Sequence, residues 1–346
     1  MGSMTVVRMV CMATICGLVI GLSAPSGADE AVAFRTLCAN RAAEGDSMAV
    51  AGIDGWLFLR SELRHLGVGP FWGPAAAQVS RAKPDKADPL PAIADFSRQL
   101  ADRGITLLVA PVPCKAAIHA DKLGVTSRDR LDTAERDFQA ALGAAGIAVV
   151  DLAEPFVQAK ADATAGPPYC RTDTHWSPRG CEIAAAVVAQ RIEALDGAKA
   201  WLSKARRKFV AHADRRHVVG DLGGGGEPED VSARVITAPG GGTAEDRSSP
   251  VLLLGDSHVL VFHAGADLHG TNAGLADQMA FELGIPIDVL GVRGSGATPA
   301  RINLLRRAKT DPNYLGGKKV IVWCFAAREF TEGSGWALVP LPDVAR

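Results

Sequence analysis

One serine stands where a buried strand is expected to end. The apolar run 251–254 leads directly into Gly255, Asp256 and Ser257. Ligands of open α/β sheets bind at the carboxyl ends of the strands, and a serine that opens a helix there lies beside main-chain N–H groups that can stabilise an oxyanion. Gly255 permits a tight turn, and Asp256 can cap the neighbouring N–H groups. Taken alone, however, this short tripeptide is better explained as a strand ending in a helix-capping serine.

A carboxylate and an imidazole lie two residues apart in a second segment. Asp173 and His175 precede a helix that is expected to begin at Pro178. In an extended chain, residues i and i+2 project to the same side. Asp173 can therefore accept the Nδ1–H of His175, fix its tautomer and leave Nε2 free to act as a base. A capping loop with a surface histidine explains this segment equally well.

The two segments together supply a nucleophile, a base and an orienting acid. Such triads are recognised by their geometry and not by their order in the chain. We therefore predict that Asp173, His175 and Ser257 converge. His258 adjoins the nucleophile and is an alternative base, but we favour His175 because Asp173 lies two residues before it.

The surrounding pattern indicates a parallel sheet that would position these residues. Three times, a predicted helix ends in a glycine that is followed by isoleucine and an apolar run. Glycine suits the left-handed cap of a helix, and the apolar runs are typical of strands buried on both faces. Alternation of helices with such strands predicts helices on both sides of the sheet. The helix and strand pairs are 91–103 with 104–109, 128–145 with 146–151, and 274–283 with 284–289.

Further elements follow from local signals. Strands are predicted at 250–254 and 319–325, and a helix at 178–195, with Ser177 as its N-cap and a proline at its first position. Residues 218–249 contain two glycine runs and are predicted to form a long surface excursion. Neither run is followed by Lys-Ser or Lys-Thr, which excludes a phosphate-binding P-loop.

Composition excludes several classes of protein. The 346 residues include 37 basic and 38 acidic side chains, a net charge of −1 that argues against binding nucleic acid. Hydrophobic residues make up 48% and charged residues 22%, which excludes extensive disorder.

The N-terminus has the pattern of an export signal. Within residues 1–28, Arg8 is followed by the apolar run 9–22 and by small residues at 26–28. We predict cleavage before Asp29 and a periplasmic or secreted protein. An uncleaved inner-membrane anchor is the alternative, although the run is short for a membrane span.

Five of the seven cysteines lie outside the predicted signal, and an exported chain meets an oxidising compartment in which disulfides can form. Five is an odd number, so at most two disulfides can form, and we expect one, with a pairing that the sequence does not fix. No Cys-x-x-Cys pair occurs, which argues against zinc-finger and thioredoxin sites. These cysteines are Cys38, Cys114, Cys170, Cys181 and Cys324.

Several blocks of the chain resemble the alginate O-acetyltransferase family, whose catalytic domain is SGNH-hydrolase-like. They contain Gly-Trp-Leu-Phe, Pro-x-Pro-x-Lys, Asp-x-His-Trp, Gly-Asp-Ser and a late strand followed by Arg328. The likeness covers roughly residues 50–330. The blocks lie at 53–59, 111–115, 172–176, 255–257 and 320–330.

The resemblance implies a flavodoxin-like, three-layer α/β/α fold with a mainly parallel sheet. It also implies a permuted motif order, because the serine block comes first in ordinary SGNH esterases. We expect a single domain over residues 29–346. Few residues follow Arg328, so no C-terminal carbohydrate-binding domain is expected.

The resemblance further implies acetyl transfer to hydroxyls of an exported, alginate-like polysaccharide. Ser257 would carry the acetyl group, His175 would act as general base and Asp173 would orient it. A membrane acyltransferase would supply the acetyl group, export-complex proteins are possible partners, and no cofactor is expected. The alternatives are a secreted carbohydrate acetyl esterase with the same triad and a non-catalytic, polysaccharide-binding scaffold of an export complex.

Other polar and aromatic residues are candidates for substrate contacts. The N–H groups of Ser257 and Gly294 are candidates for the oxyanion hole, although a plain glycine-rich turn explains Gly294 equally well. Arg293 and Arg328 could contact a sugar carboxylate, with a structural salt bridge or an exposed side chain as the alternative. Tryptophans could stack on sugars, although core packing is their usual role. They are Trp56, Trp176 and Trp336.

Two positions depart from the family pattern, namely His258 beside the nucleophile and Cys324 where a polar residue is expected. A metal site is the other possibility for the histidines that follow Ser257. Their spacings match no recognised metal motif, so exposed or helix-capping histidines are the preferred interpretation. The candidate ligands are His258, His263 and His269, with Asp256 or Asp267.

Overall fold

A five-stranded, fully parallel sheet forms the centre of the protein in a computed structural model, in the strand order β4-β3-β9-β7-β8. The structure describes residues 1–2, 27–127, 129–160, 162, 164–223, 227–238, 240 and 244–342. The central strand, β9, is buried along its whole length, as expected for a sheet covered on both faces. The strands are β3 (Thr106–Val112), β4 (Ala148–Val149), β7 (Val251–Gly255), β8 (Asp288–Gly291) and β9 (Val320–Ala326).

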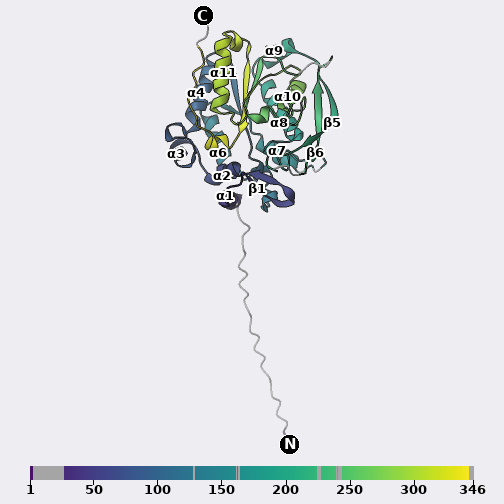
Figure 1. Cartoon of the computed structure of the whole chain (residues 1–346). Helices are drawn as coiled ribbons and strands as arrows, with labels where there is room; N and C mark the ends of the chain where they lie inside the picture. The colour runs from purple at the N-terminus through teal and green to yellow at the C-terminus, as the bar shows by residue number, and fades with distance from the viewer. Residues whose placement is uncertain are drawn as a thin grey trace.

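Helices cover both faces of this sheet. Figure 1 shows α4 and α11 on one side and α8 and α10 on the other, which confirms the predicted three-layer α/β architecture. The N-cap predicted at Ser177 is present, because its hydroxyl accepts a hydrogen bond from the Gly180 N–H at the start of α8. The main helices are α4 (Pro89–Ala101), α6 (Thr133–Ala144), α8 (Pro178–Glu193), α10 (Leu275–Leu283) and α11 (Thr298–Thr310).

The first described elements pack at the carboxyl edge of the sheet. Helix α2 contacts α5 and α12, which follow β3 and β9, and α1 packs along α2. Strands β1 and β2 form a separate antiparallel pair. The remaining elements are α1 (Gly27–Ala43), β1 (Ala49–Ala51), β2 (Leu57–Leu59), α2 (Arg60–Val68), α3 (Ala76–Val79), α5 (Lys115–Ile118), α7 (Ala153–Lys160), α9 (Ala198–Ala205) and α12 (Glu329–Glu332), with 3₁₀ turns at Ile53–Gly55, Gly73–Ala75, Pro84–Lys86, Ala120–Leu123, Ser257–Val259 (η5) and Tyr314–Gly317.

An antiparallel hairpin lies at the periphery, outside α8 and α10 (Figure 1). Its strands are β5 (Val210–Val218) and β6 (Glu229–Thr237). The prediction of a surface excursion over 218–249 is therefore wrong for β6, where Val235 and Ile236 are buried. Polar residues and glycine runs on either side of β6 obscured its pattern in the sequence. Residues 224–226 and 241–243 of the glycine runs lie outside the described part of the chain.

Several predicted boundaries shift. The strands predicted at 104–109 and 284–289 are observed as β3 and β8, at Thr106–Val112 and Asp288–Gly291. Helix α6 begins at Thr133 and not at residue 128, because the Arg130 side chain binds the carboxylates of Asp132 and Asp151 and holds the preceding segment in a loop. The strand predicted at 146–151 contains only the two residues of β4, at the edge of the sheet.

The expected disulfide is absent among the five cysteines, all of which the structure describes as free and buried. They lie on separate elements in the apolar core, and burial raises the pKa of each thiol. The predicted signal sequence lies almost entirely outside the described residues. Within the described ranges, no helix combines the length and apolar character needed to cross a bilayer.

Candidate active site

Ser257 opens the 3₁₀ turn η5 at the carboxyl end of β7. Gly255 makes the sharp turn possible, since a Cβ there would lie 1.9 Å from the carbonyl oxygen of Cys324 on the neighbouring strand. The carboxylate of Asp256 accepts the N–H of His258 and caps the turn. Gly296 also lies close to this turn, since a Cβ added there would lie 2.7 Å from the Asp256 nitrogen. Sequence analysis did not predict this second close approach.

The structure brings the three predicted residues together. The Nε2 atom of His175 lies 2.8 Å from the Oγ of Ser257, and its Nδ1 lies 2.6 Å from Oδ1 of Asp173. A carboxylate can only accept, so Nδ1 carries the proton and Nε2 is left to accept the serine O–H. Asp173 and His175 come from the loop before α8, as their spacing predicts.

Asp173 receives four hydrogen bonds, two on each oxygen. The main-chain N–H and Nδ1–H of His175 donate to Oδ1, while the Asp221 N–H and Nε2 of His269 contact Oδ2 at 3.1 and 2.9 Å. Burial raises the pKa of this carboxyl, but the hydrogen bonds from His175 and His269 outweigh burial and hold the pKa well below its usual value. Asp173 is therefore ionised.

The connection between β5 and β6 holds the loop that carries Asp173. The carboxylate of Asp221 accepts the N–H and the hydroxyl of Thr174, both at 2.7 Å. The Leu222 N–H donates to the carbonyl of Thr172, and a Cβ at Gly220 would lie 2.1 Å from that same oxygen. The sequence analysis missed these contacts, because they join residues 172–174 to residues 220–222, which are far apart in the chain.

A buried lysine ties the same loop to the N-terminal region. The ammonium of Lys115, which is fully buried, donates to the carbonyls of Leu57, Arg171 and Asp173 at 2.7, 2.9 and 2.9 Å. Burial lowers the pKa of Lys115 to about 8. Two of the blocks that resemble the acetyltransferase family, 53–59 and 111–115, thus meet at the loop of the Asp-x-His-Trp block.

A second Asp–His pair adjoins Ser257. Asp256 Oδ1 accepts the N–H of His258 at 2.8 Å and lies 2.9 Å from its Nδ1. His258 is buried, and Trp176 donates from Nε1 to its carbonyl oxygen. Burial lowers the pKa of His258 and keeps it neutral.

The histidine that hydrogen-bonds Ser257 is His175. The spacing that favoured His175 is also present at His258, because Asp256 stands two residues before it. Spacing alone does not separate the two histidines, but their surroundings do.

The other candidates fall into different environments. The three tryptophans Trp56, Trp176 and Trp336 are buried, which corrects the idea that they stack on sugars. Arg293 is exposed and forms two hydrogen bonds of 2.7 Å with Asp267. The Nη1 atom of Arg328 is buried and has no hydrogen-bond partner among the described residues.

Gly294 lies in the loop after β8 and has a φ of 91°. Among the described residues, no main-chain hydrogen bond joins Gly294 to Ser257. Its place in the oxyanion hole therefore stays a prediction. The N–H of Ser257 itself remains available at the start of η5, since the hydrogen bonds of that turn begin at residue 258.

The three histidines considered as metal ligands do not converge. His258 pairs with Asp256, His263 with Asp277 and His269 with Asp173. Two other groups of potential ligands occur among the described residues. One is Asp173, His175 and Asp221, which the network above already occupies, and the other is the buried set His65, Cys114 and Glu135.

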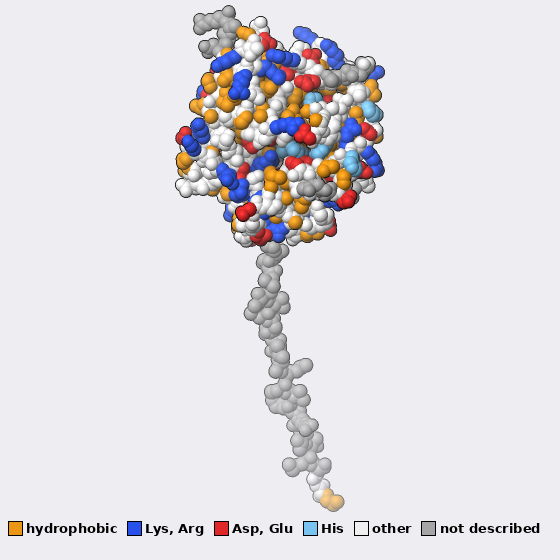
Figure 2. Space-filling view, in the orientation of Figure 1, with side chains coloured by type: hydrophobic (Ala, Val, Ile, Leu, Met, Phe, Trp, Pro, Cys, Tyr) orange, Lys and Arg blue, Asp and Glu red, His pale blue; other side chains and the backbone are white. Residues whose placement is uncertain are grey.

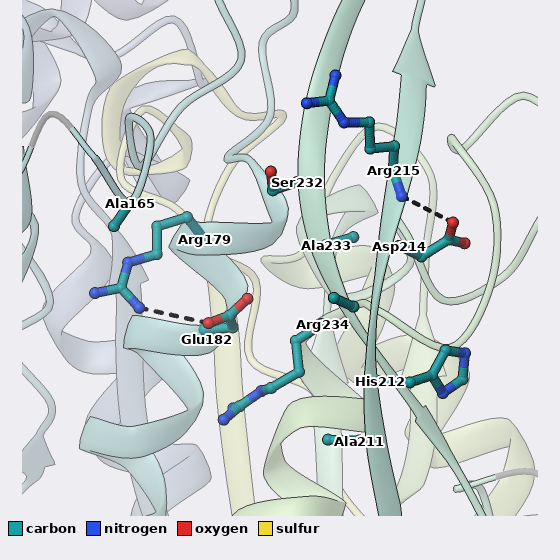
Figure 3. Close-up of a pocket in the computed structure, with 11 residues that line it drawn as sticks. Ala165, Arg179, Glu182, Ala211, His212, Asp214, Arg215, Ser232, Ala233 and Arg234 are labelled. Atoms are coloured by element: carbon teal, nitrogen blue, oxygen red, sulfur yellow. Dashed lines mark hydrogen bonds and ion pairs between the residues drawn. The ribbon is translucent and has the colours of Figure 1, made fainter.

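A cavity of about 930 Å³ lies between the hairpin and the start of α8 (Figure 3). None of the triad residues lines it. Two of its arginines have carboxylate partners, since Arg179 contacts Glu182 at 3.4 Å and Arg234 contacts Glu282 at 2.7 Å. This cavity is therefore not the site of the chemistry at Ser257.

The protein surface carries mixed charge. Figure 2 shows histidine side chains near the middle of one face, beside both basic and acidic side chains. A single large field of one sign is not visible on that face, in keeping with the near-neutral composition.

Comparisons with known proteins agree with this fold. A family described as "SGNH hydrolase-like domain, acetyltransferase AlgX" matches residues 49–327. The O-acetyltransferase domain of Pseudomonas putida AlgJ superposes with a TM-score of 0.61 at 23% identity, over 83% of this chain and 93% of that one. Pseudomonas aeruginosa AlgX superposes with a TM-score of 0.55 at 17% identity, over 81% of this chain and 62% of that one. The predicted SGNH-like fold is confirmed.

Two relatives found by sequence comparison are named probable alginate O-acetylase AlgJ. The probable alginate O-acetylase AlgJ of Pseudomonas aeruginosa is 33% identical over 181 residues, which are 52% of this chain and 41% of that protein. The corresponding protein of Pseudomonas putida is 26% identical over 304 residues, covering 82% of this chain and 71% of that protein. The match thus spans less than half of the Pseudomonas aeruginosa relative.

Proposed function

The chain belongs to the family of SGNH hydrolase-like acetyltransferase domains that includes AlgX, and we propose that it transfers acetyl groups to hydroxyls of an exported polysaccharide such as alginate. The observation that carries this proposal is the 2.8 Å contact between His175 Nε2 and Ser257 Oγ, with ionised Asp173 behind the imidazole. The choice of an acetyl group and of alginate as the polymer rests on the AlgJ relatives, which are named probable alginate O-acetylases.

The first half of the reaction loads Ser257. Nε2 of His175 takes the hydroxyl proton while Oγ attacks the carbonyl carbon of the acetyl donor. The tetrahedral intermediate collapses, the bond to the leaving group breaks, and the leaving group takes the proton from His175. The acetyl group is then an ester on Ser257.

The second half transfers the acetyl group. His175 takes the proton of a sugar hydroxyl, whose oxygen attacks the acetyl carbon, and Ser257 Oγ leaves and regains the proton. The N–H of Ser257, assisted by that of Gly294, would stabilise the oxyanion in both halves. Asp173 keeps His175 in the correct tautomer and stabilises the imidazolium that forms twice per cycle.

Substrate contacts and partners belong to the same proposal. The unpaired Nη1 of Arg328 is a donor for a sugar carboxylate, whereas Arg293 would first have to leave Asp267. A membrane acyltransferase would provide the acetyl group outside the cytoplasm, which requires export through the N-terminal signal. Proteins of the export complex would bring the polymer to Ser257.

Acyl transfer and hydrolysis differ only in the acceptor, so the test must offer both. The purified protein is incubated with p-nitrophenyl acetate, with and without deacetylated alginate oligosaccharides. Acetylated oligosaccharide, detected by mass spectrometry, is the expected result. Acetate alone identifies an esterase and contradicts the transfer step.

Matched variants decide whether Ser257 does the chemistry. Ser257→Ala should abolish product formation, whereas Ser203→Ala, on the exposed surface of α9, should leave it unchanged. If the purified Ser257→Ala protein acetylates normally, another of its residues does the chemistry. A scaffold is identified instead if polymer acetylation in cells survives Ser257→Ala but is lost when the whole protein is deleted.

A further inference from the structure

A second histidine contacts the carboxylate of Asp173 from the side opposite His175. Nε2 of His269 lies 2.9 Å from Oδ2, while Nδ1 of His175 lies 2.6 Å from Oδ1. Only 11% of the His269 side chain and 1% of the Asp173 side chain are exposed, so water competes little for this contact. A carboxylate only accepts, so His269 donates from Nε2. The reaction described above makes no use of this histidine.

The backbone around His269 adopts unfavourable conformations to hold it there. His269 itself has a φ of 63°, and Phe262, Ala266 and Asn272 in the same loop also have positive φ values, between 52° and 65°. Residues with a Cβ seldom adopt this region, because the Cβ there crowds the following carbonyl oxygen. Such strain persists only where the surrounding structure imposes it, and it is typical of functional sites.

The loop is closed tightly enough to impose that strain. Phe262 donates from its main-chain N–H to the Leu268 carbonyl at 2.7 Å, and Ala273 donates to the Phe262 carbonyl at 2.9 Å. The buried ring of Phe262 packs against the imidazole of His269, with 5.5 Å between the ring centres. The start of this loop is fixed to the turn of the nucleophile, because Val261 donates to the Ser257 carbonyl.

We propose that His269 is a positioning residue for the acetyl transfer, an inference that rests on the proposed roles of Asp173, His175 and Ser257. Together with the Asp221 N–H, it holds Oδ2 and so fixes the plane of the carboxylate. Oδ1 then stays aligned with Nδ1 of His175. His269 follows Ser257 in the chain, so the contact also joins the segment that carries the nucleophile to the loop that carries the base.

Removal and replacement of the donor test this role. In p-nitrophenyl acetate hydrolysis or transfer, His269→Ala should lower kcat about ten- to a hundredfold and leave KM within about twofold, since the contact orients the base and does not bind substrate. His269→Gln carries an amide N–H of similar reach and should recover kcat to within about threefold of the wild type. The control His217→Ala removes another histidine paired with a carboxylate, Asp230, on the exposed hairpin and should change neither constant.

Reactivity of Ser257 gives an independent readout. Phenylmethylsulfonyl fluoride sulfonylates a serine that its base has activated, so the rate of modification should fall in His269→Ala in parallel with kcat and recover in His269→Gln. If the alanine variant does not fold, the glutamine variant decides, and it must react at a rate within about threefold of the wild type.

The inference is overturned if His269→Ala keeps kcat and the sulfonylation rate within about twofold of the wild type. A folded His269→Gln as impaired as the alanine variant overturns it too, as does a rise in KM with unchanged kcat. Ser257→Ala separates this failure from that of the proposed function. If Ser257→Ala is inactive while His269→Ala is normal, only the positioning role fails.

Discussion

Asp-x-His occurs three times in this protein, and two of the copies, Asp173 with His175 and Asp256 with His258, have nearly identical local geometry. In both of these, one carboxylate oxygen accepts both the main-chain N–H and the Nδ1–H of the histidine two residues later. The distances are 2.8 and 2.6 Å for Asp173 and His175, and 2.8 and 2.9 Å for Asp256 and His258. Local hydrogen bonding therefore does not distinguish a base from a structural histidine.

The environment beyond the pair makes the difference. His175 lies at the carboxyl edge of the sheet, where Nε2 reaches Ser257. His258 packs under Trp176 with the two rings perpendicular, and its acid holds β9 through the Ala326 N–H. One pair thus orients a base toward a nucleophile, and the other fixes the turn on which that nucleophile stands.

The largest expected effect contrasts the two histidines directly. His175→Ala removes the base and should lower kcat by about a thousandfold or more. His258→Ala leaves the base in place and should lower kcat by less than about tenfold. Steady-state hydrolysis of p-nitrophenyl acetate measures both, and losses of similar size would contradict the distinction.

Lys115 donates to the loop that carries Asp173 and His175, so its replacement tests the first Asp–His pair separately from the second. Lys115→Met removes an ammonium donor from three carbonyl oxygens, so the loop of Asp173 should shift and kcat should fall about ten- to a hundredfold. Lys122→Met, which removes an ammonium paired with Asp54 at the surface, is the matched control and should be silent. A Lys115→Met protein with normal kcat would show that the loop holds its geometry unaided.

The second pair should matter for stability. His258→Ala leaves the fully buried carboxylate of Asp256 without one of its donors, which should cost about 1–3 kcal/mol of unfolding free energy. Urea denaturation measures this cost, with His217→Ala as the exposed control. Unchanged stability in His258→Ala would mean that the pair does not hold the turn.

Another aspartate–histidine contact, between Asp277 and His263, extends the comparison to pH and carries the smallest effect. Burial lowers the pKa of His263, but Asp277 and Glu245 outweigh burial and raise it to about 10. A folded-state pKa above the usual 6.5 means that this contribution to stability is full below about pH 6.5 and is lost as pH rises through about 10. The stability difference between the wild type and His263→Gln should therefore shrink between pH 6.5 and 10, as urea titrations at several pH values would reveal. A constant difference would contradict the protonated state of His263.

The fold and the triad residues were accessible to sequence analysis because their signals are local. Apolar runs after helix-ending glycines predicted the parallel strands, and the caps at Ser177 and Asp256 fixed the segments around the site. Spacing did not distinguish His175 from His258, since an aspartate stands two residues before each, and only the contact with Ser257 separates them.

The residues that sequence analysis misplaced act through contacts distant in the chain. His269 was a weak metal candidate, and Asp221 lay in a segment predicted to be a surface excursion, yet both donate to Asp173. The predicted oxidising compartment suggested a disulfide, whereas the core buries all five thiols as free cysteines. Such outcomes depend on the packing of the whole domain, which no local pattern encodes.

The most direct test of the account is the acetyl-enzyme itself. Brief exposure to p-nitrophenyl acetate, an acid quench and peptide mass spectrometry should give an increase of about 42 Da on the peptide that contains Ser257, and none in Ser257→Ala. An acetyl group found on another residue, or turnover of the ester by Ser257→Ala at the wild-type rate, would contradict the central claim.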